Sequence, residues 1–146
     1  MGDALADRLA IQDVMTRYAT GVDTRDLELY ASCFAENVVV SGFGREAIRG
    51  RAAWMTFVTG ALERFGRTQH LIGNHVVEIR GDEATMRCYV QATHELAADR
   101  TQLMTLWATY HDTLHRIDGE WRIVDHRLEP IATQTRPTGA PTPKAQ

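Results

Sequence analysis

The sequence predicts an α+β domain in which a curved, mostly antiparallel sheet wraps around three N-terminal helices. Apolar residues recur at helical spacings through the first 65 residues, whereas four β-rich runs follow Gly66. Short polar connections, two of which place glycine beside aspartate, join those runs. Because short connections favour hairpins, the four runs should form an antiparallel meander.

The expected helices occupy the N-terminal part of the chain. Apolar residues from Ile11 to Val22 recur at spacings of three and four, and Gly21 stands where a helix C-terminal cap belongs. Gly66 closes the last helix. The elements expected before Gly66 are helices over residues 4–20, 24–35 and 47–65 and a short strand over residues 36–44.

The expected strands span residues 67–80, 83–95, 103–116 and 120–134. In the second strand every other residue from Ala84 to Ala92 is apolar, and His94 continues that set, so His94 should point into the concave interior. The third strand is apolar on both faces near its start. This pattern predicts that the convex face is covered by another subunit, in a homodimer or homotrimer.

Length and composition indicate one soluble domain over residues 1–135, followed by a disordered tail over residues 136–146 that lacks apolar content. The net charge of −3, with both signs interspersed, does not indicate a nucleic-acid surface. The chain shows neither a signal-peptide pattern nor an apolar run long enough to cross a bilayer. With two cysteines and no CxxC motif, we expect a cytoplasmic protein with free thiols.

The stretch RTQHLIGNHVV, residues 67–77, contains two histidines in an otherwise apolar run. Residues five apart in a strand face opposite sides, so His70 and His75 should not form a local metal site. Asn74, in phase with His70, could line the same cavity. No HxxxH or HExxH spacing occurs in the chain, and we expect neither a metal nor a cofactor.

Four residues are candidates for chemistry, each with a structural alternative. Asp23 could cap the next helix, Tyr18 could be a core aromatic residue, and His70 an ordinary strand residue. His94 could be a hydrogen-bonded core residue. If they share one cavity, however, an aspartate bonded to a histidine Nδ1 would make Nε2 a base able to remove a proton beside a carbonyl.

The last strand adds a guanidinium to this set. Arg127 shares its parity with Trp121 and Ile123, so it should face inward with them and bind an anionic group. The other strand histidines are expected to be exposed or interfacial: His111, His115 and His126.

Three segments carry a family resemblance: residues 5–40, "TQHLIGNHVVEI" at 68–79 and "YHDTLHRIDGEWRIVDHRL" at 110–128. They resemble the SnoaL-like family of the NTF2-like superfamily over roughly residues 5–130. The resemblance implies a cone-shaped fold with a deep pocket at its open end. Polyketide cyclases, scytalone dehydratase, bile acid dehydratase and a dehydrochlorinase are members of this type.

The resemblance implies that Asp23 and His70 are a catalytic dyad, with Tyr18 and His94 as further catalytic residues. Arg127 matches a late-strand arginine of the family. Both dehydratases carry a tyrosine at the end of the first strand, where this chain has Gly42 and Phe43 instead. The residues expected to form an apolar substrate-binding wall are Phe43, Trp54 and Val90.

The function that follows is a cofactor-independent lyase, first of all a dehydratase, acting on an apolar cyclic or polyketide-like small molecule. His70 would remove a proton beside a carbonyl. A polyketide cyclase or isomerase of the same fold is one alternative. A non-catalytic ligand-binding or structural subunit, like the small subunit of a dioxygenase, is the other.

Overall fold

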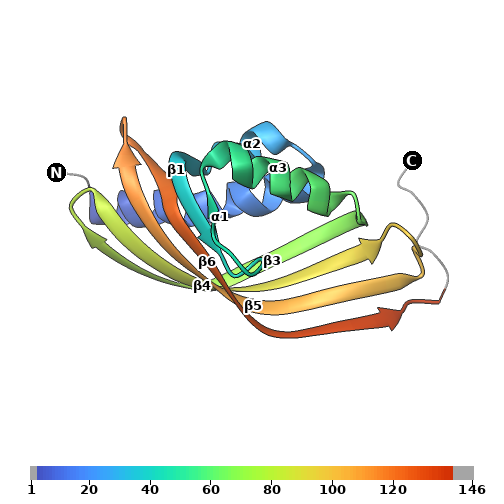
Figure 1. Ribbon diagram of the computed structural model, residues 1–146. Helices are drawn as coiled ribbons and strands as arrows, with labels where there is room; N and C mark the ends of the chain where they lie inside the picture. The colour runs from blue at the N-terminus through green and yellow to red at the C-terminus, as the bar shows by residue number, and fades with distance from the viewer. Residues whose placement is uncertain (1–2, 140–146) are drawn as a thin grey trace.

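The computed structural model describes residues 3–139 and shows helices seated in the hollow of one strongly curved sheet (Figure 1). Its helices are α1 (Ala4–Thr24), α2 (Leu27–Ala31) and α3 (Arg51–Leu62). Its strands are β1 (Phe34–Ser41), β2 (Ile48–Arg49), β3 (Phe65–Arg80), β4 (Glu83–Leu96), β5 (Gln102–Ile117) and β6 (Glu120–Pro137).

The six strands are ordered β2-β1-β6-β5-β4-β3. Strands β3 to β6 form the expected antiparallel meander, and β1 joins β6 in parallel. The helices α1, α2 and α3 lie over the concave face of this sheet, as Figure 1 shows. The predicted cone-shaped α+β fold is therefore confirmed.

The first helix is longer than predicted and does not end at Gly21. It continues to Thr24, and Arg25 forms the left-handed cap with φ of 62°. Gly21 is needed for a different reason, because a Cβ atom there would lie 2.7 Å from the backbone nitrogen of Tyr30. The bare Gly21 backbone thus lets α1 pack directly against α2.

A bulge in β3 overturns the prediction that His70 and His75 face opposite ways. Between Gly73 and Val76 the strand carries one more residue than β4, and Asn74 adopts a φ of 53°. The extra residue inverts the alternation. His75 therefore faces the same side as His70, and Asn74 is exposed rather than directed into the cavity.

A second bulge, in β6, reverses the prediction for Arg127. Leu114 pairs with Ile123 and Thr113 pairs with Asp125, so Val124 is an extra residue. Beyond it the even-numbered residues face inward. The side chain of Arg127 is therefore 49% exposed and pairs with Glu129 on the outer face.

The same bulge turns His126 inward, against the prediction that it is exposed or interfacial. Its side chain is completely buried, together with Asp112 of the neighbouring strand. Of the other two strand histidines, His115 is exposed as predicted, whereas His111 is half-buried.

The ends and the outer face complete the fold. Strand β6 reaches Pro137 and so includes the start of the tail expected at residues 136–146; residues 140–146 lie outside the described part. Leu71, Tyr89 and Ile131 are exposed apolar side chains, and the expected homo-oligomer stays a prediction. Within residues 3–139 no helix is long and apolar enough to span a membrane.

Two helical glycines give a test of the α1–α2 contact. Gly21→Ala should destabilise the fold by about 1–3 kcal/mol, because its methyl group overlaps the Tyr30 backbone. Gly60→Ala in α3, where a Cβ atom meets nothing within 4 Å, should stabilise it by about 0.5–1 kcal/mol. Urea denaturation measures both, and an equal effect of the two substitutions would contradict the packing described.

Candidate active site

The end of α1 is joined to β3 through the carboxylate of Asp23. Its Oδ1 accepts hydrogen bonds from His70 Nδ1 at 2.7 Å and from Thr68 Oγ1 at 2.9 Å. Its Oδ2 accepts one from the backbone N–H of His70 at 2.7 Å. With Nδ1–H donating to the carboxylate, the Nε2 atom of His70 is left as a free acceptor.

These contacts keep Asp23 ionised. Burial disfavours the carboxylate, but the hydrogen bonds from the His70 ring and backbone outweigh it and lower the pKa of Asp23 below its ordinary value. The side chains of His70 and Asp23 are 10% and 19% exposed, so the pair is largely shielded yet reachable. An anion fixed beside the imidazole holds it in the tautomer that leaves Nε2 unprotonated.

His70 lines a cavity of about 210 Å³ between the helices and the sheet. The walls are largely apolar and aromatic, and they include Phe43 and Trp54 as expected. The wall also has five further polar side chains: Tyr18, Tyr30, Arg64, His94 and Tyr110. The ring centroid of His70 lies 6.4 Å from the ring centroid of Tyr18 and 5.7 Å from that of His94.

His94 faces inward as predicted, and its surroundings keep it neutral. Burial, together with the nearby His70, lowers the pKa of His94 to about 4. Its Nδ1 lies 3.3 Å from the carbonyl oxygen of Met104, to which a neutral imidazole donates its proton. The Nε2 atom of His94 is then a hydrogen-bond acceptor rather than an acid.

Tyr18 belongs to a buried polar network that the sequence did not indicate. Its hydroxyl lies 3.3 Å from the hydroxyl of Tyr110 and 3.2 Å from Nε2 of His126. On the other side of that ring, Nδ1 lies 2.5 Å from Oδ1 of Asp112. Burial raises the pKa of Tyr18 well above its ordinary value, so its hydroxyl keeps its proton.

Two of the expected site residues do not reach the cavity. Arg127 lies on the outer face because of the β6 bulge. Val90 is buried in the core. The residues of β4 that line the cavity are the next two on the same face, Ala92 and His94. The alternation of β4 gave the correct face for Val90 but not its position along the strand.

Tyr110, Asp112 and His126 are the residues that sequence reasoning missed. Tyr110 and Asp112 stand on a strand that is apolar on both faces, where periodicity does not say which face is inner. A histidine and an aspartate on strands predicted to be neighbours were a signal for a pair. The bulge at Val124 concealed it, because parity turned His126 outward.

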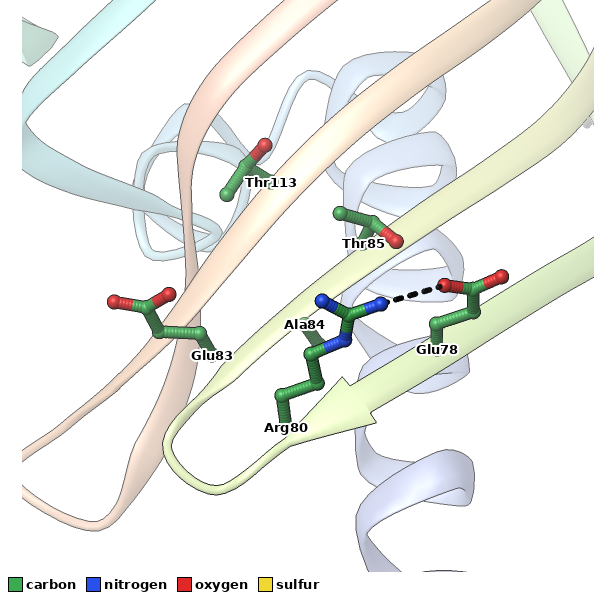
Figure 2. A pocket seen from close by; sticks show the side chains of 6 residues that line it. All are labelled: Glu78, Arg80, Glu83, Ala84, Thr85 and Thr113. Carbon is green, nitrogen blue, oxygen red and sulfur yellow. Dashed lines mark ion pairs between the residues drawn. The ribbon is translucent and has the colours of Figure 1, made fainter.

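Another hollow lies on the outer side of the sheet and lacks these features (Figure 2). It has a volume of about 250 Å³ at the β3–β4 hairpin, with α1 behind the sheet. Its ion pair, Arg80 with Glu78, joins two highly exposed side chains at 4.0 Å, which contributes little. Among residues 3–139 there is no group of three side chains that could hold a metal ion.

A family model for the SnoaL-like domain matches residues 3–127. The chain belongs to this family. An uncharacterized protein of Mycobacterium tuberculosis is 27% identical to this SnoaL-like protein over 124 residues, which cover 82% of each chain.

Solved structures extend the comparison. A scytalone dehydratase-like protein of Novosphingobium aromaticivorans is 26% identical, with a TM-score of 0.84 over 97% of this chain and 95% of that one. The hexachlorocyclohexane dehydrochlorinase LinA-type3 of Novosphingobium barchaimii is 22% identical, with a TM-score of 0.83 over 97% of both chains. The second likeness shows the fold alone.

The neutral state of His94 leads to a prediction for the SnoaL-like protein. In a ¹H–¹⁵N titration His94 should gain its second proton only near pH 4, against about 6.5 in an unfolded chain. The unfolded state thus binds more protons between these values, so stability should fall as the pH drops from about 6.5 to 4. His94→Gln should remove that part of the loss, and a titration midpoint near 6.5 would contradict the shielding described.

Proposed function

We propose that this SnoaL-like protein is a cofactor-independent dehydratase for an apolar cyclic carbonyl compound. The observation that carries the proposal is the Asp23–His70 hydrogen bond at the wall of an apolar cavity. A structural subunit gains nothing from a base aimed into a hollow. The fold, the family and the dehydratase-like neighbour support a lyase acting on a small molecule.

The reaction begins with His70. Its Nε2 removes a proton from the carbon beside the substrate's carbonyl group, and the C–H electron pair becomes an enolate. Asp23 holds the imidazole in the tautomer that leaves Nε2 free and stabilises the imidazolium that forms. Such base catalysis accounts for about 10²–10⁴-fold in rate, so the enolate oxygen needs a donor as well.

Tyr18 and Tyr110 supply the donor groups. One hydroxyl binds the carbonyl oxygen as charge develops on it. The enolate then re-forms the carbonyl as the C–O bond at the β-carbon breaks, and the leaving hydroxide takes the proton held by the His70 imidazolium and departs as water, which leaves Nε2 of His70 free again. His94, an acceptor at Nε2, would hold the hydroxyl group of the substrate before it leaves.

An isomerase or cyclase would share the first step, since each requires an enolate. The neutral His94 favours dehydration, because an acceptor near His70, in addition to the donor hydroxyl of Tyr18, suits a substrate that carries both a carbonyl and a hydroxyl group. A small cyclic substrate of this class matches a cavity of about 210 Å³.

The test is a panel of cyclic β-hydroxy ketones, with scytalone as one member, followed by the ultraviolet absorbance of the conjugated product. Asp23→Asn and His70→Gln should each lower kcat by about 10²–10⁴-fold and leave the fold intact. The matched control is His75→Gln, on the same face of β3 but outside the cavity, which should keep wild-type turnover. The proposal would be contradicted if both dyad variants kept wild-type turnover, or if the wild-type protein turned over none of the panel compounds.

A further inference from the structure

A second aspartate–histidine pair lies deeper in the fold than the dyad. Both side chains, Asp112 on β5 and His126 on β6, are 0% exposed. Aromatic rings surround the imidazole: the ring centroids of Phe43 and Trp54 lie 5.7 and 6.3 Å from it. The pair therefore does not line the cavity itself, and its hydrogen bond to a cavity-lining residue is the one to the hydroxyl of Tyr18.

The surroundings of Asp112 bear on how many protons this pair holds. Oδ2 of Asp112 is buried and has no hydrogen-bond partner among residues 3–139, so a carboxylate beside a neutral imidazole would be a poorly compensated buried anion. One further proton on the pair would remove this cost. The pair is then either an imidazolium beside a carboxylate or a neutral imidazole that accepts the proton of an Oδ1–H carboxyl group, because a proton on Oδ2 would meet no acceptor among residues 3–139.

Both arrangements have the same consequence at the far side of the ring. In each, Nδ1 and Oδ1 share one proton, and Nε2 of His126 carries the other. The Nε2–H group must then donate to the Tyr18 oxygen, which lies 3.2 Å away. The proton of Tyr18 is consequently free to point toward Tyr110, toward Tyr30 or into the cavity.

We infer that Asp112 and His126 are positioning residues that turn the Tyr18 and Tyr110 hydroxyls into a donor site for an oxyanion in the cavity. The two hydroxyls lie 3.3 Å apart and both line the cavity wall that includes His70. The ligand class is a carbonyl compound whose oxygen becomes negative, or a stable phenolate that imitates it. The inference deepens the proposed function and rests on it for the identity of the substrate.

The first test observes the proton directly. A two-bond ¹H–¹⁵N correlation spectrum of the wild-type protein distinguishes a protonated from an unprotonated imidazole nitrogen. We expect Nε2 of His126 to carry a proton and Nε2 of His70 to lack one at neutral pH. An unprotonated Nε2 on His126 would overturn the inference, whatever any variant does.

The second test uses 4-nitrophenolate as an oxyanion probe, with binding followed by its visible absorbance. Tyr18→Phe and His126→Leu should each weaken binding by about tenfold or more, as expected for loss of a hydrogen bond to a charged group. His126→Gln retains an N–H that can reach Tyr18 and should restore most of the affinity. His115→Gln, on an exposed side chain paired with Glu83, is the matched control and should bind as wild type does.

A structural role for the pair predicts a different pattern. A folded His126→Leu protein that binds the phenolate as tightly as wild type, or a wild-type protein that does not bind it, would contradict the inference. Thermal unfolding of each variant identifies those that fold. If His126→Leu does not fold, the wild-type ¹H–¹⁵N spectrum still tests whether Nε2 of His126 carries a proton. Neither the spectrum nor the binding measurement depends on turnover. A failure of this inference can therefore be distinguished from a failure of the proposed dehydration.

Discussion

The geometry of the candidate site depends on one carboxylate, that of Asp23, at the point where α1 approaches β3. Its three hydrogen bonds to Thr68 and His70 attach the helix to the strand and orient an imidazole at the same time. Arg25, the helix cap, adds contacts to Thr68 and to the carbonyl oxygen of Gly66. The contact that attaches α1 to β3 therefore also orients the imidazole of His70, which lines the cavity.

The two aspartate–histidine pairs, Asp23–His70 and Asp112–His126, differ in burial, and this difference gives them different roles. Asp23 is partly exposed and has three donors, so it remains an anion and leaves Nε2 of His70 as an acceptor. Asp112 is sealed from solvent with one oxygen unpartnered among the described residues, and this favours a neutral pair whose Nε2 donates. On this account one pair supplies a base for the α-carbon, and the other positions donors for the oxygen of the neighbouring carbonyl group.

Much of the fold could be predicted from the sequence, and six of the eight expected site residues lie in the dyad or at the cavity wall. Hydrophobic periodicity gave the helices and the meander, and the alternation of β4 correctly placed His94 inside. The failures have one main physical cause. A strand's alternation inverts across a bulge, and bulges in β3 and β6 have no strong sequence signal, so His75, Arg127 and His126 were assigned to the wrong faces. Val90 failed for another reason, since periodicity gives a face but not a depth.

The central claim is that His70 Nε2 removes a proton from carbon inside this cavity. Its most direct test is deuterium exchange in D₂O at the α-carbon of 2-tetralone, a bicyclic ketone with no leaving group, followed by ¹H NMR. This measures proton abstraction apart from loss of water. The account predicts exchange well above the buffer rate for wild type and a return to that rate when the His70 imidazole is replaced. Exchange that is unaffected by replacing His70 would contradict it.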